Sequence, residues 1–185
     1  IMDFTRWRTF LVNSNGVSFS ATDGAYHCNL MFSSRDGDKT SSFNGAAVSL
    51  KDLGKELLAC GSLRTLPAQS AEQIETKPLR GKFVGDVIYT PDCLGDLLSF
   101  LFSSVSDGPM IAGTSIYKDS LEKQVAGPLL SVHARPTSDA IADKTFLTGD
   151  GYAAKDCTFL DRGVLKSYLL SLYGSRKTGK PRTLN

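Results

Sequence analysis

The side chains able to bind a transition metal are few and widely spaced. The sequence has two histidines, and none of its four cysteines forms a Cys-x-x-Cys pair. His27 and Cys28 are neighbours in a predicted strand, so their side chains should point to opposite faces, which argues against joint binding of one ion. A hydrogen-bonded structural role is the simpler interpretation of His133, with a general base or metal ligand as the alternative. The cysteines are interpreted as reduced and mostly buried, because the sequence as written begins without secretory features. They are Cys28, Cys60, Cys93 and Cys157.

Two aspartates lie four residues apart at the start of a predicted helix. Asp92 is in its first turn, where the helix macrodipole favours an acid, and this structural role is the simpler interpretation. Asp96 could bind a hard cation, but a single carboxylate is not a zinc site. A site that joins Asp96, His133 and a cysteine would require convergence over a long stretch of sequence, and it stays open as an alternative.

A phosphate-binding pattern and a basic cluster lie near the end of the sequence. Residues 174–180 match the G-x-x-x-x-G-K part of a phosphate-binding loop, but Pro181 follows where the loop needs Ser or Thr. No amphipathic helix follows to receive a phosphate, so we interpret the match as chance. The basic side chains of this stretch, Arg176, Lys177, Lys180 and Arg182, are interpreted as a solvated tail. The sequence has no G-x-S-x-G nucleophile elbow.

The elements that position these residues are predicted to be antiparallel strands followed by helices. Strands are expected at 8–12, 17–20, 25–32 and 39–48, with turns at 13–16, at Asp23-Gly24 and at 35–38. A helix over 50–60, with Ser49 as its N-cap, is followed by a surface connection over 64–78 and a strand over 82–89. The helix from Pro91 to about Val105 is apolar almost all round, which predicts a central, buried position. Strands at 129–133, 152–160 and 164–172 follow, with a loop at 135–143 and a turn at 161–163.

The predicted fold class is α+β, with a mostly antiparallel sheet as a meander or a barrel-like closure, a buried central helix and one shorter helix. A chain of 185 residues fits a single β-rich domain, 1–185. Its net charge of +2 is too small to indicate nucleic-acid binding. No apolar run approaches the length of a membrane span. We therefore expect a cytoplasmic protein that binds neither nucleic acid nor membrane.

Five separated segments carry a resemblance to a known family. Residues 163–169, Gly-Val-Leu-Lys-Ser-Tyr-Leu, match it best, and residues 173–179 follow in the expected order. The other three segments are 13–16, 115–126 and 146–151. In these segments the sequence resembles the TldD/PmbA family of peptidase-related proteins (PmbA is also called TldE), described as modulators of DNA gyrase. The resemblance is to part of the family's C-terminal region, so an N-terminal domain and the extreme C-terminus are expected to be absent.

The resemblance also bears on the helix that begins at Pro91. Where the metal-binding branch carries H-E-x-x-x-H, this sequence reads Pro-Asp-Cys-Leu-Gly-Asp over residues 91–96. Pro91 has no side-chain ligand atom, Asp92 stands where the general base would be, and Asp96 replaces the second histidine. The sequence is therefore similar to the PmbA/TldE-like branch. No catalytic, metal-binding or cofactor-binding residue is expected in it, and zinc is expected in a TldD-like partner.

The function implied by this resemblance is that of a non-catalytic subunit. It would belong to a TldD/PmbA-type metallopeptidase complex that acts in proteolysis or maturation of unfolded peptides. Its partner would be a TldD-like subunit or a second copy of itself, and its substrate an unfolded peptide. Two alternatives stay open: an independent metallopeptidase with the atypical site described above, and a β-rich binding module that acts through residues 177–182.

Overall fold

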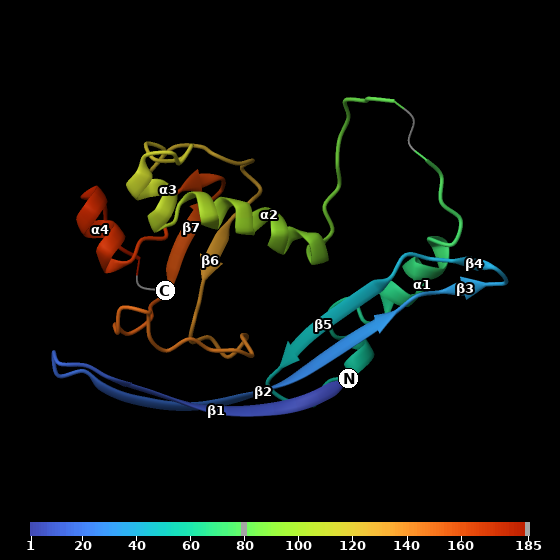
Figure 1. The fold of residues 1–185 in the computed structure, drawn as a ribbon, viewed down its shortest axis with the longest axis horizontal. Coiled ribbons are helices and arrows are strands. Elements are labelled where there is room, and N and C mark those ends of the chain that lie inside the picture. The colour runs from blue at the N-terminus through green and yellow to red at the C-terminus, as the bar shows by residue number, and fades with distance from the viewer. Residues whose placement is uncertain (79–80, 184–185) are drawn as a thin grey trace. The chain divides into compact units, whose positions relative to one another are not determined.

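The computed structural model describes residues 1–78 and 81–183, and it is a mixed α+β structure with antiparallel sheets (Figure 1). The predicted α+β class is confirmed. The chain divides into two compact units: unit 1 contains residues 1–9 and 22–88, and unit 2 contains residues 10–21 and 89–185. Strand order is β1-β2-β5 in one sheet, β3-β4 in a hairpin and β6-β7-β8 in the other sheet, and none of these described sheets is a closed barrel.

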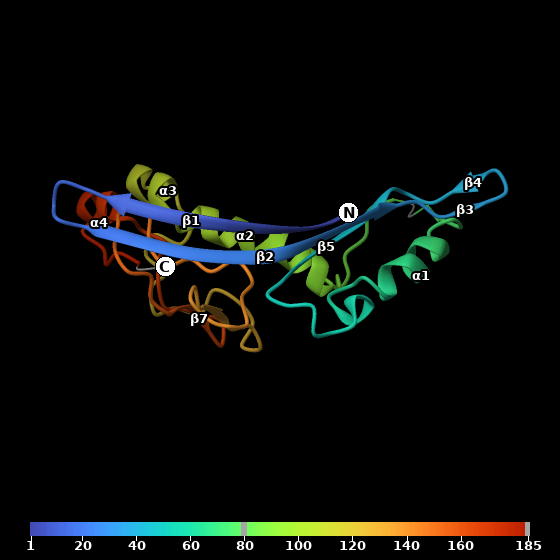
Figure 2. The same ribbon diagram turned by 90° about the horizontal axis from the view of Figure 1, so that it is seen from below.

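A long hairpin begins the chain, and its two strands lie side by side in Figures 1 and 2. Strand β1 is Met2–Val12 and β2 is Ser18–Phe32. The predicted turn at 13–16 is confirmed: the Asn13 side chain accepts hydrogen bonds from the backbone N–H groups of Asn15 and Val17, at 2.9 and 3.2 Å, and Gly16 has φ of 83°. Both features are typical of a tight turn.

The predicted turn at Asp23-Gly24 is wrong, because β2 runs straight through it. Gly24 lies under a neighbouring ring: a Cβ there would be 3.0 Å from Cζ of Phe4. Asp23 forms an ion pair with Lys51. The Asp-Gly pair therefore serves close packing and charge pairing within the sheet, and not chain reversal.

The helix predicted over 50–60 is also wrong. Strand β5 (Asn44–Leu50) pairs antiparallel with β2, with Ser49 opposite His27 and Leu50 opposite Tyr26. Ser49 is thus in the sheet and is not a helix N-cap. Only the 3-10 turn η1 (Leu57–Ala59) follows.

Helix α1 (Thr65–Glu72) occupies the stretch for which the sequence predicts a surface connection. It is attached by a polar network around Ser70, which is fully buried. The Ser70 hydroxyl lies 3.0 and 3.1 Å from those of Ser34 and Ser41, and the Asn44 side chain donates to it at 3.0 Å. Figure 2 shows α1 beside the hairpin of β3 (Arg35–Asp36) and β4 (Lys39–Thr40), which confirms the turn predicted at 35–38.

The strand predicted over 82–89 is wrong as well: residues 81–89 form neither helix nor strand and are exposed. Val84, for instance, is 105% exposed. Its β-branched residues favour a strand, but a strand requires a partner for its backbone groups, and none of the described residues pairs with this segment there.

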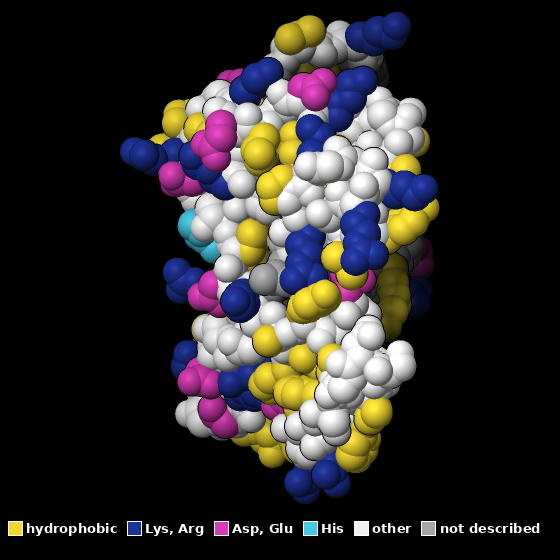
Figure 3. Space-filling view, turned by 90° about the vertical axis from the view of Figure 1, so that its left-hand side faces the viewer, with side chains coloured by type: hydrophobic (Ala, Val, Ile, Leu, Met, Phe, Trp, Pro, Cys, Tyr) yellow, Lys and Arg dark blue, Asp and Glu magenta, His cyan; other side chains and the backbone are white. Residues whose placement is uncertain are grey.

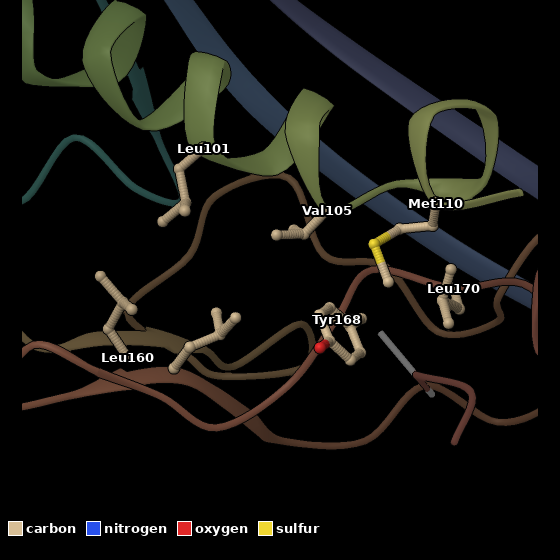
Figure 4. Close-up of a cluster of buried hydrophobic side chains, with 7 residues drawn as sticks. Leu101, Val105, Met110, Leu160, Tyr168 and Leu170 are labelled. Atoms are coloured by element: carbon tan, nitrogen blue, oxygen red, sulfur yellow. The ribbon is translucent and has the colours of Figure 1, made fainter. Parts of the chain in front are cut away.

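Unit 2 is built on helix α2 (Pro91–Ser104) and the core below its C-terminal end. The predicted helix is confirmed, and its Leu101 packs in the core with Val105 and with residues of α3 (Asp107–Ala112) and the sheet (Figure 4). The all-round apolar sequence predicts burial on every side, yet Leu97 and Phe100 are 45% and 60% exposed. The buried core contacts of the helix are at its C-terminal end, at Leu101 and Val105. The seven buried members of the core are Leu101, Val105, Met110, Leu160, Leu165, Tyr168 and Leu170.

The remaining strands are shorter than predicted. They are β6 (Val132–Ala134), β7 (Cys157–Asp161) and β8 (Val164–Leu165), paired antiparallel. The turn at 161–163 is confirmed, with φ of 47° at Arg162 and 77° at Gly163. A Cβ at Gly163 would be 2.2 Å from the Ala126 carbonyl oxygen, so close backbone approach also requires glycine here.

Candidate functional site

The degenerate motif positions lie on the exposed first turns of α2. Thr90 is the N-cap and Pro91 occupies the first helical position, where proline is favoured. Pro91, Asp92 and Asp96 are all exposed. These three residues do not fit a catalytic zinc, because one has no ligand atom and the other two supply carboxylates without an imidazole or thiolate. Over residues 1–78 and 81–183, no group of three or more His, Cys, Asp or Glu side chains could hold a metal ion.

Each histidine has a hydroxyl partner across its strand pair. Nδ1 of His27 is 3.0 Å from Oγ of Ser49, and Nδ1 of His133 is 2.9 Å from Oγ1 of Thr158. A hollow of about 180 Å³ beside His133 is also lined by Cys157 and Asp156, while Asp96 is not among its lining residues. The structure thus brings His133 to a cysteine but not to the aspartate of the atypical site considered above.

All four cysteines are free thiols, as the sequence predicts, but only Cys60 is buried. Cys28 and Cys157 are half-buried and Cys93 is exposed on α2. The prediction that they are mostly buried is therefore wrong: Cys93, for instance, is in the first turn of α2, while the core contacts of that helix are at its C-terminal end.

A pocket of about 360 Å³ lies where two of the family-like segments, 146–151 and 163–169, meet. Residues 148–150 belong to the segment 146–151. Residues 169–171 begin at the end of 163–169 and lead into helix α4 (Leu172–Thr178), which contains most of 173–179. Residues 106–108, at the start of α3, and Thr183 complete the lining. Segments far apart in the sequence are thus joined at one place in unit 2.

A hydrogen-bond network around Asp107 holds this pocket together. Its Oδ1 accepts from the backbone N–H of Ser171 at 3.0 Å, and its Oδ2 accepts from the Ser171 hydroxyl. Oγ of Ser171 in turn accepts from the N–H groups of Tyr173 and Gly174, at 3.1 and 3.2 Å. The carboxylate of Asp150 accepts from the N–H of Leu172 at 2.7 Å.

These contacts decide what the start of α4 can bind. Its first N–H groups are satisfied by Ser171, Asp107 and Asp150, so they do not form an anion cradle. Residues 174–178 are helical, unlike the loop of a phosphate site. The interpretation of the G-x-x-x-x-G-K match as chance is thereby supported. The Ser171 hydroxyl is directed to a carboxylate, and neither histidine lines the pocket, so this is not a Ser-His-Asp arrangement.

Gly174 makes the network possible. A Cβ at this position would be 1.8 Å from Oδ1 of Asp107 and 2.5 Å from its Cγ. Only glycine allows the carboxylate to sit against the first turn of α4, so this part of the family-like segment has a packing role.

The prediction of a solvated tail is wrong for Lys180 and Arg182, which are half-buried, whereas Arg176 and Lys177 are exposed as expected but belong to helix α4. The Lys180 ammonium lies 5.2 Å from the Tyr168 ring and the Arg182 guanidinium 3.5 Å from the Tyr152 ring. Thr183 is only 7% exposed and accepts a hydrogen bond from the Leu170 N–H at 3.2 Å. Figure 3 shows Lys and Arg side chains spread over the face that it displays, with apolar and acidic side chains between them. Residues 184 and 185 lie outside the described residues.

The family is decided by the match of residues 81–185 to the model of the PmbA/TldA metallopeptidase C-terminal domain. The chain belongs to the PmbA/TldD family. Among the relatives of this family member is an uncharacterized protein from Methanocaldococcus jannaschii, 24% identical over 184 residues, which cover 95% of this chain and 40% of that protein. Another is a metalloprotease PmbA homolog from Haemophilus influenzae, 27% identical over 97 residues, which cover 52% of this chain and 22% of that protein.

Solved structures share its fold. TldE from Thermococcus kodakarensis has a TM-score of 0.76 at 14% identity, covering all of this chain and 41% of that one. A protein described as a modulator of DNA gyrase, from Bacteroides thetaiotaomicron, has a TM-score of 0.77 at 17% identity, covering 99% and 41%. The PmbA/TldD member described here thus spans about 40% of the length of these structures. No helix within its described residues is both long and apolar enough to cross a membrane.

Sequence reasoning missed Asp107 and Ser171 as a pair. One signal was available: a serine directly before residues 172–178 is a common N-cap type. Asp107 gave no such signal, because Asp-Gly-Pro is typical of a turn and its partner lies 64 residues away.

Proposed function

We propose that this PmbA/TldD family chain acts as a PmbA/TldE-like, non-catalytic subunit of a TldD/PmbA-type metallopeptidase complex. Its substrates would be unfolded peptides that the complex degrades or matures. Zinc and the general base would come from a TldD-like partner. Assembly with such a partner is favoured over a homodimer, because two copies of this chain would both lack the histidine motif. A cytoplasmic location and a single β-rich domain stay predictions.

The observation that carries this proposal is the chemistry of the exposed start of α2. The helix is formed, and its first turns present Pro91, Asp92 and Asp96 in place of the ligands and base of H-E-x-x-x-H. A proline without a ligand atom and two carboxylates do not replace two imidazoles. The family fold is thus kept in a chain whose motif helix does not fit metal chemistry.

The described sheets also offer a means of binding an extended peptide. Strands β1 and β5 are the edges of the sheet β1-β2-β5, and β1 is eleven residues long. An edge strand presents backbone N–H and C=O groups to which an extended peptide can pair whatever its sequence. This suits a subunit that receives unfolded peptides. A peptide that binds out of register with every strand of this chain would contradict this part of the proposal.

The test is peptide hydrolysis by the protein and a family partner that carries H-E-x-x-x-H, measured separately and together. We expect cleavage of an unfolded peptide only in the mixture. A partner variant with the first motif histidine changed to alanine is the matched control, and its mixture should be inactive. Chelator-sensitive cleavage by this protein alone would contradict the proposal and would indicate an atypical metal site. Inactive mixtures with every such partner would favour a binding module.

A further inference from the structure

The N-terminal part of helix α2 carries apolar side chains that the core of unit 2 does not cover. Cys93, Leu97 and Phe100 follow one another at spacings of four and three residues, so they form one stripe along the helix. All three are exposed, Phe100 at 60%. We call this stripe, with Asp92 and Asp96 beside it, the outer face of α2. The core residues Leu101 and Val105 follow at further spacings of four residues, so the outer face is the N-terminal part of α2, before the helix reaches the core.

The charged side chains of helix α2 have one sign. They are Asp92 and Asp96, and the helix has neither lysine nor arginine. At a spacing of 100° per residue, Asp96 and Asp92 fall on the same flank of the stripe. The outer face is therefore an apolar strip with an acidic border, whereas the chain as a whole carries a net charge of +2.

We propose that the outer face docks a polypeptide segment with apolar side chains on one side and lysine or arginine beside them. Apolar residues would pack on Leu97 and Phe100, and the cations would lie against Asp92 and Asp96. The acidic border disfavours nucleic acid and anionic lipid surfaces, both of which carry negative charge. This inference rests on the proposed function, because a subunit without its own chemistry acts through contacts with other polypeptides. The start of the motif helix thus has a binding role in place of a catalytic one.

The experiment uses two synthetic fluorescent peptides, one with leucine and lysine at helical spacing and one with glutamate for each lysine. Binding to the full chain is measured by fluorescence anisotropy at low and at high salt. The apolar variant is Leu97→Gln with Phe100→Gln, and the charge variant is Asp92→Asn with Asp96→Asn. The matched control is Leu129→Gln, which removes a fully exposed leucine elsewhere in unit 2. Thermal melting of each variant checks that it is folded.

We expect the lysine peptide to bind and the glutamate peptide to bind at least about tenfold more weakly. The apolar variant should weaken binding of the lysine peptide about tenfold or more. The charge variant should weaken it several-fold at low salt and reduce its salt dependence. The control should bind as the unchanged protein does. Equal binding of both peptides, or unchanged binding by the apolar variant, overturns the inference.

The hydrolysis assay separates failure of this inference from failure of the proposed function. If the mixture with an H-E-x-x-x-H partner is active but binding does not depend on the outer face, the inference fails and the subunit role stands. If the mixture is inactive while binding follows the outer face as expected, the subunit role fails and the docking surface stands.

Discussion

Replacing Gly174 with alanine should destabilise unit 2 through a clash with a single carboxylate. The new Cβ would be 1.8 Å from Oδ1 of Asp107, so the carboxylate must move away from Ser171. Two hydrogen bonds to a charged acceptor are then lost, each worth about 1.5–3 kcal/mol. Alanine in a helix regains about 1 kcal/mol relative to glycine. The net loss in the free energy of unfolding is therefore about 2–5 kcal/mol.

The assay is thermal unfolding, with hydrogen exchange of the α4 amides as a local measurement. For a chain of this size the loss corresponds to a melting temperature lower by roughly 5–20 °C. Gly95→Ala is the matched control, because it is also a helical glycine but its Cβ would have no described atom within 4 Å. That change should be neutral or stabilise the protein by up to about 1 kcal/mol.

A double-mutant cycle with Asp107→Ala tests the cause. Once the carboxylate is removed, Gly174→Ala should cost little or become stabilising. If Gly174→Ala costs as much in the Asp107→Ala background as in the unchanged protein, the clash with Asp107 is not the reason for glycine at this position.

Three further changes test other parts of the structure. Gly163→Ala should lower the free energy of unfolding by about 2–4 kcal/mol, because its Cβ would be 2.2 Å from the Ala126 carbonyl oxygen and the backbone there is left-handed. Urea unfolding measures this loss, and an unchanged free energy of unfolding would contradict the geometry. Ser70→Ala should cost about 1–3 kcal/mol by leaving buried partners of its hydroxyl unpaired, and hydrogen exchange in α1 should rise in that variant. Tyr168→Phe should lower the free energy of unfolding by about 1 kcal/mol, because the Tyr168 hydroxyl donates to the Lys118 carbonyl at 2.8 Å. Thermal unfolding measures this, and an unchanged melting temperature would show that the hydrogen bond adds no net stability.

The sequence predicted the fold class, the turns at 13–16, 35–38 and 161–163, and the helix that begins at Pro91. These succeed because turn residues and a proline at the first helical position act locally. The failures come from distant contacts. Ser49 has the residue type of an N-cap, but pairing with His27 places it in a sheet. The Asp23-Gly24 pair has the type of a turn, but Phe4 and Lys51 hold it within β2.

For the site, the sequence shows which residues replace the motif but not that these residues are exposed. The residue type alone shows that Pro91 cannot bind a metal through its side chain. It does not show that Leu97 and Phe100 are exposed, because α2 is apolar all round and the part of it that is covered depends on where the sheet β6-β7-β8 packs. The pocket at the start of α4 likewise depends on Asp107, whose partner is remote in sequence.

The link between Asp107 and Ser171 has a consequence for the order of folding. Helix α4 has seven residues, fewer than the roughly 12–15 that an isolated helix needs in water. The carboxylates that stabilise its first turn come from positions 64 and 22 residues earlier in the chain. Closing loops of that length costs conformational entropy before the distant contacts can form, so α4 should form late, after α2 and α3 have packed. Hydrogen exchange during refolding would then protect α2 before α4, and in the native protein α4 should be among the first segments of unit 2 to open.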